Sequence, residues 1–184
     1  MPKAEGPMVT TQEDFVREAL DQYESPLIGY AVTFLHDVER ARDVVQDTFI
    51  RLYQQDVEKV RGGVKTWLFT VCRNRALDII RKERRVIGLK EDELARVPTS
   101  RRTPAERIDL EERIAQVRLA LGKLSENQRE VILLKFEQGL SYREISKVTG
   151  LSEGNVGFLL HNGLKRLRSI LPKDLLQNLN PQRV

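Results

Sequence analysis

The sequence has one cysteine, few aromatic residues and no long hydrophobic run, and each shortage excludes a kind of structure. Cys72 is the only cysteine among 184 residues, and aromatic residues make up 6%. A single cysteine excludes an internal disulfide and an all-cysteine metal cage, and it suits a reducing compartment. No uninterrupted apolar run approaches the roughly 18 residues of a membrane span, and the first residues lack a signal-peptide core. We expect a soluble, cytoplasmic protein without membrane insertion, with Cys72 in its core.

Groups that could carry catalysis are also scarce. There is no Walker-type phosphate loop, and His36, His161 and Cys72 form no nucleophile-and-base pattern. Asp43 and Asp47 could form a metal pair, but no histidine joins them at ligand spacing. We predict no enzyme activity, no cofactor and no metal site.

Helix start signals recur along the chain, whereas the alternation typical of strands is almost absent. A hydroxyl residue precedes an acid or amide by three positions at Thr11, Thr103, Ser125 and Ser141, which is the pattern of the capping box. Apolar residues follow the helical period from residue 38 to 53 and again from 64 to 80. We predict an all-α protein.

The periodicity fades between residues 88 and 103, where Pro98 and mixed charges interrupt any regular element. We predict two small helical domains, 11–87 and 104–172, joined by a flexible linker at 88–103. Residues 1–10 are expected to be a disordered N-terminus, and 173–184 a tail.

The second domain contains the spacing of a helix-turn-helix. Small Ser146 allows the two helices to approach, Gly150 four residues later supplies the positive φ of the turn, and Val156 fills the wedge between them. Ser152 is placed to cap the second helix. Any helical hairpin with a glycine turn would share these features, so this pattern alone leaves that simpler alternative open.

Basic residues concentrate in the segment 61–85. It holds eight Lys or Arg and two acidic residues, a net charge of +6, whereas the whole chain carries +4. Such a concentration favours a phosphate track over ordinary solvation. Periodicity places Trp67 in the core and Thr66, Phe69, Thr70 and Arg73 on the outer face. For Phe69, stacking on a single-stranded base and packing in the protein remain equal alternatives.

Two parts of the sequence resemble two regions of the bacterial sigma factors. Residues of "LSENQRE" and "GLSYREI" are similar to the fourth region of that family: Leu124, Gln128, Arg129, Glu130, Gly139, Leu140, Ser141, Tyr142, Glu144 and Ile145. "DVVQDTF" and "WLFTVCRNRALDIIR" resemble the second region of the extracytoplasmic-function class, through Asp43, Val45, Gln46, Asp47, Phe49, Trp67, Leu68, Asn74, Asp78 and Arg81. The two resemblances follow each other along the chain in the order of the family's second and fourth regions, and together they cover nearly all of residues 11–172.

This resemblance implies an alternative sigma factor, a non-catalytic initiation subunit that binds core RNA polymerase and promoter DNA. The polar face of the 38–53 helix, Asp43, Gln46, Asp47 and Arg51, could without context be merely solvated. The resemblance implies that this face docks on the polymerase, together with Phe49 from the apolar stripe of the same helix. Melted minus-ten bases would be captured by the loop 60–65 and Asn74, and the linker would run toward the RNA exit path. The minus-ten set is Arg61, Gly62, Gly63, Lys65, Phe69, Arg73, Asn74, Arg81, Arg84 and Arg85. Family habit also implies an anti-sigma factor as partner.

The second helix of the helix-turn-helix departs from the family pattern, because Ser152 to Leu164 contains no Lys or Arg. Asn can pair bidentately with adenine and Phe can pack on a thymine methyl, so this helix could still read an A/T-rich minus-thirty-five element. Phosphates would be held by flanking cations, Lys147 among them. The predicted minus-thirty-five set is Arg143, Ser152, Asn155, Phe158, His161, Asn162, Lys165, Arg166 and Arg168.

Three alternatives remain open. The face around Phe158 could bind a protein, such as an anti-sigma factor or the polymerase flap, instead of DNA. The whole chain could be a stand-alone helix-turn-helix regulator, which would bind duplex DNA specifically without polymerase. A nucleic-acid-processing enzyme is a third class, against which the missing catalytic groups argue.

Overall fold

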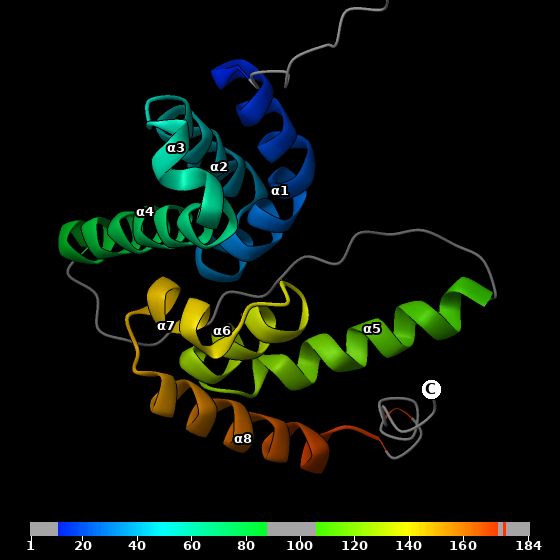
Figure 1. Cartoon of the computed structure of the whole chain (residues 1–184). Coiled ribbons are helices and arrows are strands. Elements are labelled where there is room, and N and C mark those ends of the chain that lie inside the picture. The colour runs from blue at the N-terminus through cyan, green and yellow to red at the C-terminus, as the bar shows by residue number, and fades with distance from the viewer. Residues whose placement is uncertain (1–10, 88–105, 173–174, 176–184) are drawn as a thin grey trace, which may run out of the picture. The chain divides into compact units, whose positions relative to one another are not determined.

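The computed structural model describes residues 11–87, 106–172 and 175, and within them every regular element is helical (Figure 1). The elements, in chain order, are α1 (Gln12–Leu35), α2 (Val38–Tyr53), α3 (Val57–Val60), the 3-10 turn η1 (Arg61–Gly63), α4 (Val64–Ile87), α5 (Glu106–Gly122), α6 (Glu126–Phe136), α7 (Tyr142–Thr149) and α8 (Glu153–Ile170). The all-α prediction is confirmed.

The chain forms two compact units, one within residues 1–96 and one within 97–184. The boundary falls inside the predicted linker 88–103, which itself lies outside the described residues. The predicted N-terminus 1–10 also lies outside them, as does the tail 173–184 apart from Leu175.

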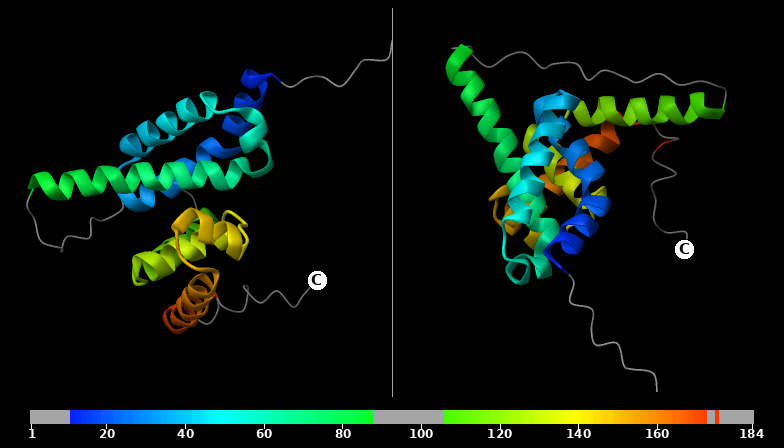
Figure 2. Two further views of the ribbon diagram at one scale, coloured as in Figure 1. Left: turned by 60° about the vertical axis from the view of Figure 1, so that its left-hand side comes forward. Right: turned by 90° about the horizontal axis from the view of Figure 1, so that it is seen from above.

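In the first unit, α1 packs against α2 and α4, and α2 also packs against α4. The carboxyl-terminal part of α4 extends past the ends of α1 and α2 (Figure 1 and Figure 2). Fully enclosed side chains at the centre are Leu27, Ala31, Ala41, Leu52, Leu68, Phe69, Cys72 and Ala76. Cys72 is therefore a core residue, as predicted, and burial raises the pKa of its thiol to about 12.

The buried face of α4 differs from the predicted one. The prediction that Phe69 lies on the outer face is wrong, because its side chain is 0% exposed and its ring lies 5.2 Å from that of Tyr30 in α1. Trp67, which was expected in the core, keeps part of its surface exposed. Both α1 and α2 cover α4, so the buried sector extends from the predicted apolar stripe toward Phe69 and Ala76.

Three of the four predicted capping boxes are present. The hydroxyls of Thr11, Ser125 and Ser141 each accept a hydrogen bond from the backbone N–H three residues later, and the acid or amide at that position accepts one from the cap's own N–H. Each box satisfies two backbone donors that a helix start leaves unpaired. Thr103 lies outside the described residues.

The second unit is built around a helix-turn-helix. Helices α6 and α7 both pack on α8, and Ile145 and Val156 are fully buried where α7 meets α8. Gly150 turns the chain at φ 76°, and the Ser152 hydroxyl accepts a hydrogen bond of 3.3 Å from the Asn155 backbone N–H to begin α8. The predicted motif and its cap are confirmed.

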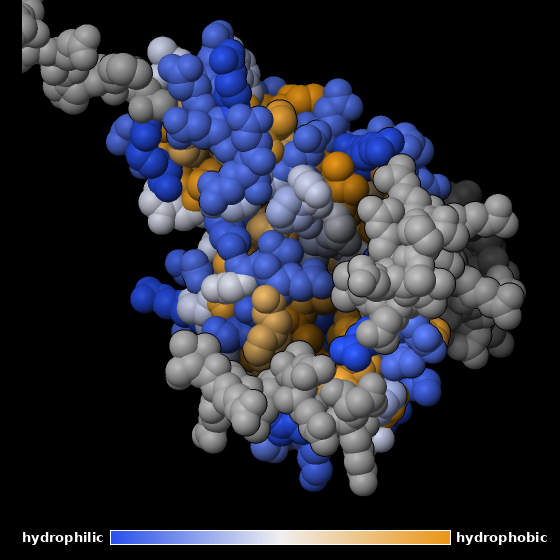
Figure 3. Space-filling view, turned by 90° about the vertical axis from the view of Figure 1, so that its right-hand side faces the viewer, coloured by the Kyte–Doolittle hydropathy of each residue, from blue (hydrophilic) through white to orange (hydrophobic). Residues whose placement is uncertain are grey.

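Polar and apolar residues are interspersed on the one face that Figure 3 draws. On the face drawn in Figure 3, hydrophilic residues predominate and hydrophobic residues lie between them in separate areas. Among the described helices, none has the length together with the apolar character that crossing a bilayer requires.

Candidate functional site

The outer face of α2 presents three of the five residues predicted to bind polymerase. Asp43, Gln46 and Arg51 are exposed. Phe49 is 6% exposed and packs into the core, as its place on the apolar stripe of this helix predicts. Asp47 is half-buried and pairs with α4.

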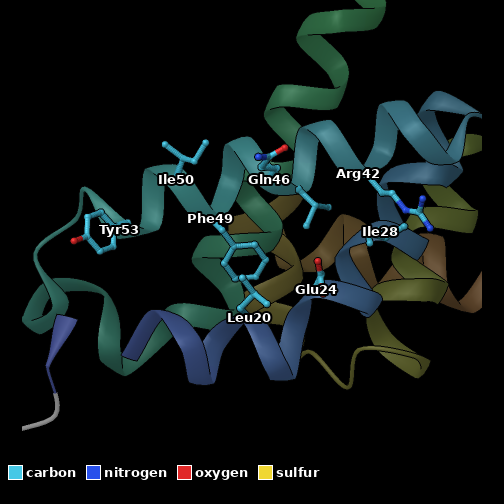
Figure 4. A pocket seen from close by; sticks show the side chains of 9 residues that line it. Leu20, Glu24, Ile28, Arg42, Gln46, Phe49, Ile50 and Tyr53 are labelled. Carbon is cyan, nitrogen blue, oxygen red and sulfur yellow. The ribbon is translucent and has the colours of Figure 1, made fainter. Parts of the chain in front are cut away.

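Next to this face, a groove of about 500 Å³ runs between α1 and α2. Its wall carries Ile50 and Tyr53, 49% and 53% exposed, and Phe49 lies toward Leu20 inside it (Figure 4). The lining residues are Leu20, Glu24, Ile28, Arg42, Val45, Gln46, Phe49, Ile50 and Tyr53. Tyr53 follows the helical period of the apolar residues from 38 to 53, which predicts a core position, and its exposure shows that this prediction is wrong. Ile50 was not among the predicted contacts. The available signal was an apolar Ile50 outside the stripe of its helix, with polar Gln46, Asp47 and Gln54 one turn away.

Two ion pairs join α2 to α4. Nε and Nη2 of Arg75 lie 3.0 and 2.9 Å from the same carboxylate oxygen of Asp47. One end of the seam is closed by a second pair, between Arg40 and Glu83. The pairs are spaced seven residues apart on α2 and eight on α4, so the helices run antiparallel along this seam. Asp47 therefore holds α4 against α2 through Arg75, in addition to any contact that it makes with a partner protein.

The segment 60–65 is helical, which corrects the expectation of a loop. Val60 ends α3 and is buried, Arg61–Gly63 form the 3-10 turn, and α4 begins at Val64. A Cβ added at Gly62 or Gly63 would meet nothing within 4 Å, so the protein itself leaves open space there. Nε of Arg61 lies 3.7 Å from Oε1 of Glu58. Cζ of its guanidinium lies over the Phe15 ring, 5.3 Å from the ring centroid.

The predicted basic track along α4 is exposed mainly in its second half. Asn74, Arg81, Arg84 and Arg85 are exposed, and Arg81 pairs with Asp78 one turn earlier at 2.7 Å. Lys65 and Arg73 are half-buried. Since Phe69 lies in the core, it cannot stack on a base in this structure, and the packed alternative for it is the correct one.

The outward face of α8 is as predicted for most of its residues. Ser152, Asn155, His161 and Phe158 are exposed, the last of them by 66%, whereas Asn162 is half-buried. Gly157 lies beneath Tyr142 of α7: an added Cβ would stand 3.4 Å from the Tyr142 ring.

The cations around this face do not all point the same way. Arg143, Lys147, Lys165 and Arg168 are exposed. The Nε of Arg166 instead donates a 3.1 Å hydrogen bond to the Lys123 carbonyl between α5 and α6. Lys135 donates to the Leu140 carbonyl at 3.2 Å and lies over the Tyr142 ring. Arg166 is nevertheless exposed, in addition to its hydrogen bond to Lys123.

The geometry agrees with the comparison to known families. Residues 19–86 match Sigma-70 region 2, and residues 114–167 match Sigma-70 region 4. These ranges coincide with the α1–α4 bundle and with the unit that contains the helix-turn-helix.

Several curated proteins are similar over most of their length. The ECF RNA polymerase sigma factor SigX of Bacillus subtilis is 31% identical over 86% of each chain. SigM of the same organism is 26% identical over 84% of this chain and 94% of its own. SigL of Mycobacterium tuberculosis, also an ECF sigma factor, is 31% identical over 85% of this chain and 88% of its own.

Solved structures share the fold. The sigma factor RpoE from Bartonella quintana, in complex with the anti-sigma factor NepR, has a TM-score of 0.61 at 24% identity, covering 90% of this chain and 98% of its own. CnrH, in complex with the cytosolic domain of CnrY, has a TM-score of 0.58 at 25% identity, covering 86% and 88%. With both sigma regions in place and relatives above 30% identity spanning most of the chain, the protein belongs to the ECF family of RNA polymerase sigma factors.

Proposed function

We propose that this sigma factor binds core RNA polymerase through the groove between α1 and α2 together with the exposed face of α2. The observation that carries this proposal is the pair of exposed apolar side chains, Ile50 and Tyr53, beside exposed Gln46 and Asp43. An apolar centre with a polar rim is the usual anatomy of a protein interface. Asp47, held by Arg75, would contribute less than Asp43.

The minus-ten element is the second proposed contact. Opening a base-pair step costs about 1.4 kcal/mol on average. A base captured on an aromatic surface returns roughly 1 to 3 kcal/mol, so one or two captured bases offset the first steps of melting. The open space at Gly62 and Gly63 admits the approach of a base, and part-exposed Trp67 is the aromatic ring that remains for stacking. Arg81, Arg84 and Arg85 would follow the phosphates.

The minus-thirty-five element of the promoter is the third proposed contact. The exposed face of α8 enters the major groove in this proposal, with Asn155 and Asn162 at base edges and Arg143, Lys147, Lys165 and Arg168 at phosphates. Asn162 is half-buried, so Asn155 is the better placed of the two amides.

Partner and compartment follow from the family. We propose an anti-sigma factor as a further partner, since RpoE of Bartonella quintana was solved with one. The cytoplasm is the proposed compartment because core polymerase and promoter DNA are found there.

The groove is tested by Ile50→Asp and Tyr53→Asp in the full chain, with core polymerase binding and transcription from mapped start sites as readouts. Each introduces a charge that core binding would have to desolvate, so affinity for core should fall about tenfold or more. The matched control is Val38→Asp, the same chemical change at another exposed position of α2, in its first turn and outside the groove lining. Wild-type affinity in both groove variants would place the polymerase contact elsewhere. Promoter-specific duplex binding without polymerase would instead favour the stand-alone regulator.

A further inference from the structure

Phe158 occupies the centre of the exposed face of α8. At about 100° per residue, it lies opposite Val156, Leu160 and Leu167, all of which are buried. Its own side chain is 66% exposed. Among the residues of α8 that face outward, it is the large apolar one, with Asn155 and His161 on either side.

The neighbours of Phe158 leave this ring prominent. Gly157 has no side chain, and one there would meet the Tyr142 ring. From Ser152 to Leu164 the only charged residue is Glu153, so this part of α8 supplies no guanidinium of its own to read guanine. The chemistry at the centre of the face is therefore an aromatic ring with amides, which suits a methyl group and an adenine edge.

Charge at the borders of the face favours DNA over a protein as its occupant. Lys165 and Arg168 are exposed in the last turns of α8, and Arg143 and Lys147 are exposed on α7. A neutral centre with cations around it matches a duplex groove, where base edges lie between two rows of phosphates. An apolar protein partner would not call for cations on both helices.

On this basis we propose that Phe158 packs on the 5-methyl group of a thymine in the upstream promoter element, with Asn155 paired to a neighbouring adenine. This inference rests on the proposed minus-thirty-five contact and names the chemical group on the DNA that Phe158 recognises. The thymine methyl projects into the major groove and is the one apolar group that distinguishes this base there.

The test uses holoenzyme, formed from core polymerase and the full chain, on a promoter whose start site has been mapped. Each upstream thymine is replaced in turn by deoxyuridine, which removes the methyl and leaves every hydrogen-bonding group. At one or two positions the affinity of the holoenzyme should fall about fourfold, as expected for one buried methyl-sized group. In Phe158→Ala, thymine and uracil templates should be bound equally.

Phe136→Ala is the matched control, because Phe136 is similarly exposed, at 62%, at the end of α6. It should keep the full preference for thymine. Equal binding of all templates by the wild type, or a preference that survives Phe158→Ala, would overturn the thymine contact. So would a Phe158→Ala variant that lowers core binding in the absence of DNA, since that result identifies a protein contact. Absence of any start-site-specific transcription would instead overturn the proposed promoter function itself.

Discussion

At the scale of single residues, Gly163 shows how closely α8 approaches α6. It is buried, and an added Cβ would stand 2.8 Å from Cδ1 of Ile132 and 3.5 Å from Cβ of Gln128. Ile132 is itself only 6% exposed, so its side chain has little room to move away. Glycine here therefore sets the distance between two helices, although glycine inside a helix is otherwise unfavourable.

We expect Gly163→Ala to lower the free energy of unfolding relative to Gly154→Ala by about 1 to 3 kcal/mol, the usual cost of overpacking. Gly154, also in α8, has nothing within 4 Å of its added Cβ, so alanine there should stabilise by up to about 1 kcal/mol. Urea unfolding followed by circular dichroism measures both. Equal stabilisation by the two substitutions would show that Ile132 can yield without cost.

At the scale of elements, the seam between α2 and α4 connects the proposed polymerase surface to the proposed minus-ten surface. Asp47 on α2 holds Arg75 on α4 at 2.9 Å, and Arg40 holds Glu83 nearer the end of α4. Both pairs are partly exposed, which limits their strength. We therefore expect these pairs to contribute little to the stability of the bundle.

A double-mutant cycle of Asp47→Asn and Arg75→Gln should give a coupling energy of about 0.2 to 1 kcal/mol, because the pair is partly solvated. The coupling should weaken at 1 M salt, where the Debye length falls to about 3 Å. Asp43→Asn is the control, since it lies exposed on the same helix and should change stability by less than about 0.5 kcal/mol. A coupling energy of zero at low salt would mean that the pair does not hold the seam.

At the scale of the whole molecule, the chain has two units with separate cores. Trp67, the only tryptophan, belongs to the first unit, whereas helices of both units contribute to circular dichroism. The two signals therefore need not report the same transition.

We expect Gly163→Ala to shift the circular dichroism transition of the second unit while the midpoint of Trp67 fluorescence stays unchanged. The complementary control is Leu68→Ala in the first unit, where Leu68 is fully buried and its truncation should cost about 2 to 5 kcal/mol. This change should move the fluorescence midpoint. A fluorescence midpoint that follows Gly163→Ala would show that the two units unfold as one.

By itself, the sequence determined the features that depend on neighbours three or four residues apart. Capping at Thr11, Ser125 and Ser141, the turn at Gly150 and the buried wedge at Val156 all agree with the structure. The two sigma regions were likewise recognisable from their motifs and order. These features are local because a cap or a turn satisfies its own backbone groups.

Only the tertiary structure decided which residues at the edges of each helix's apolar face are buried by neighbouring helices. Periodicity gives the direction of an apolar face but not its width, which depends on how many helices pack against it. Because both α1 and α2 pack against α4, the side chain of Phe69 is buried. One side of α2 stays uncovered beside α1, and there Ile50 and Tyr53 are exposed in the wall of the groove. The partner of Asp47 is 28 residues away in sequence, so no local pattern could reveal it.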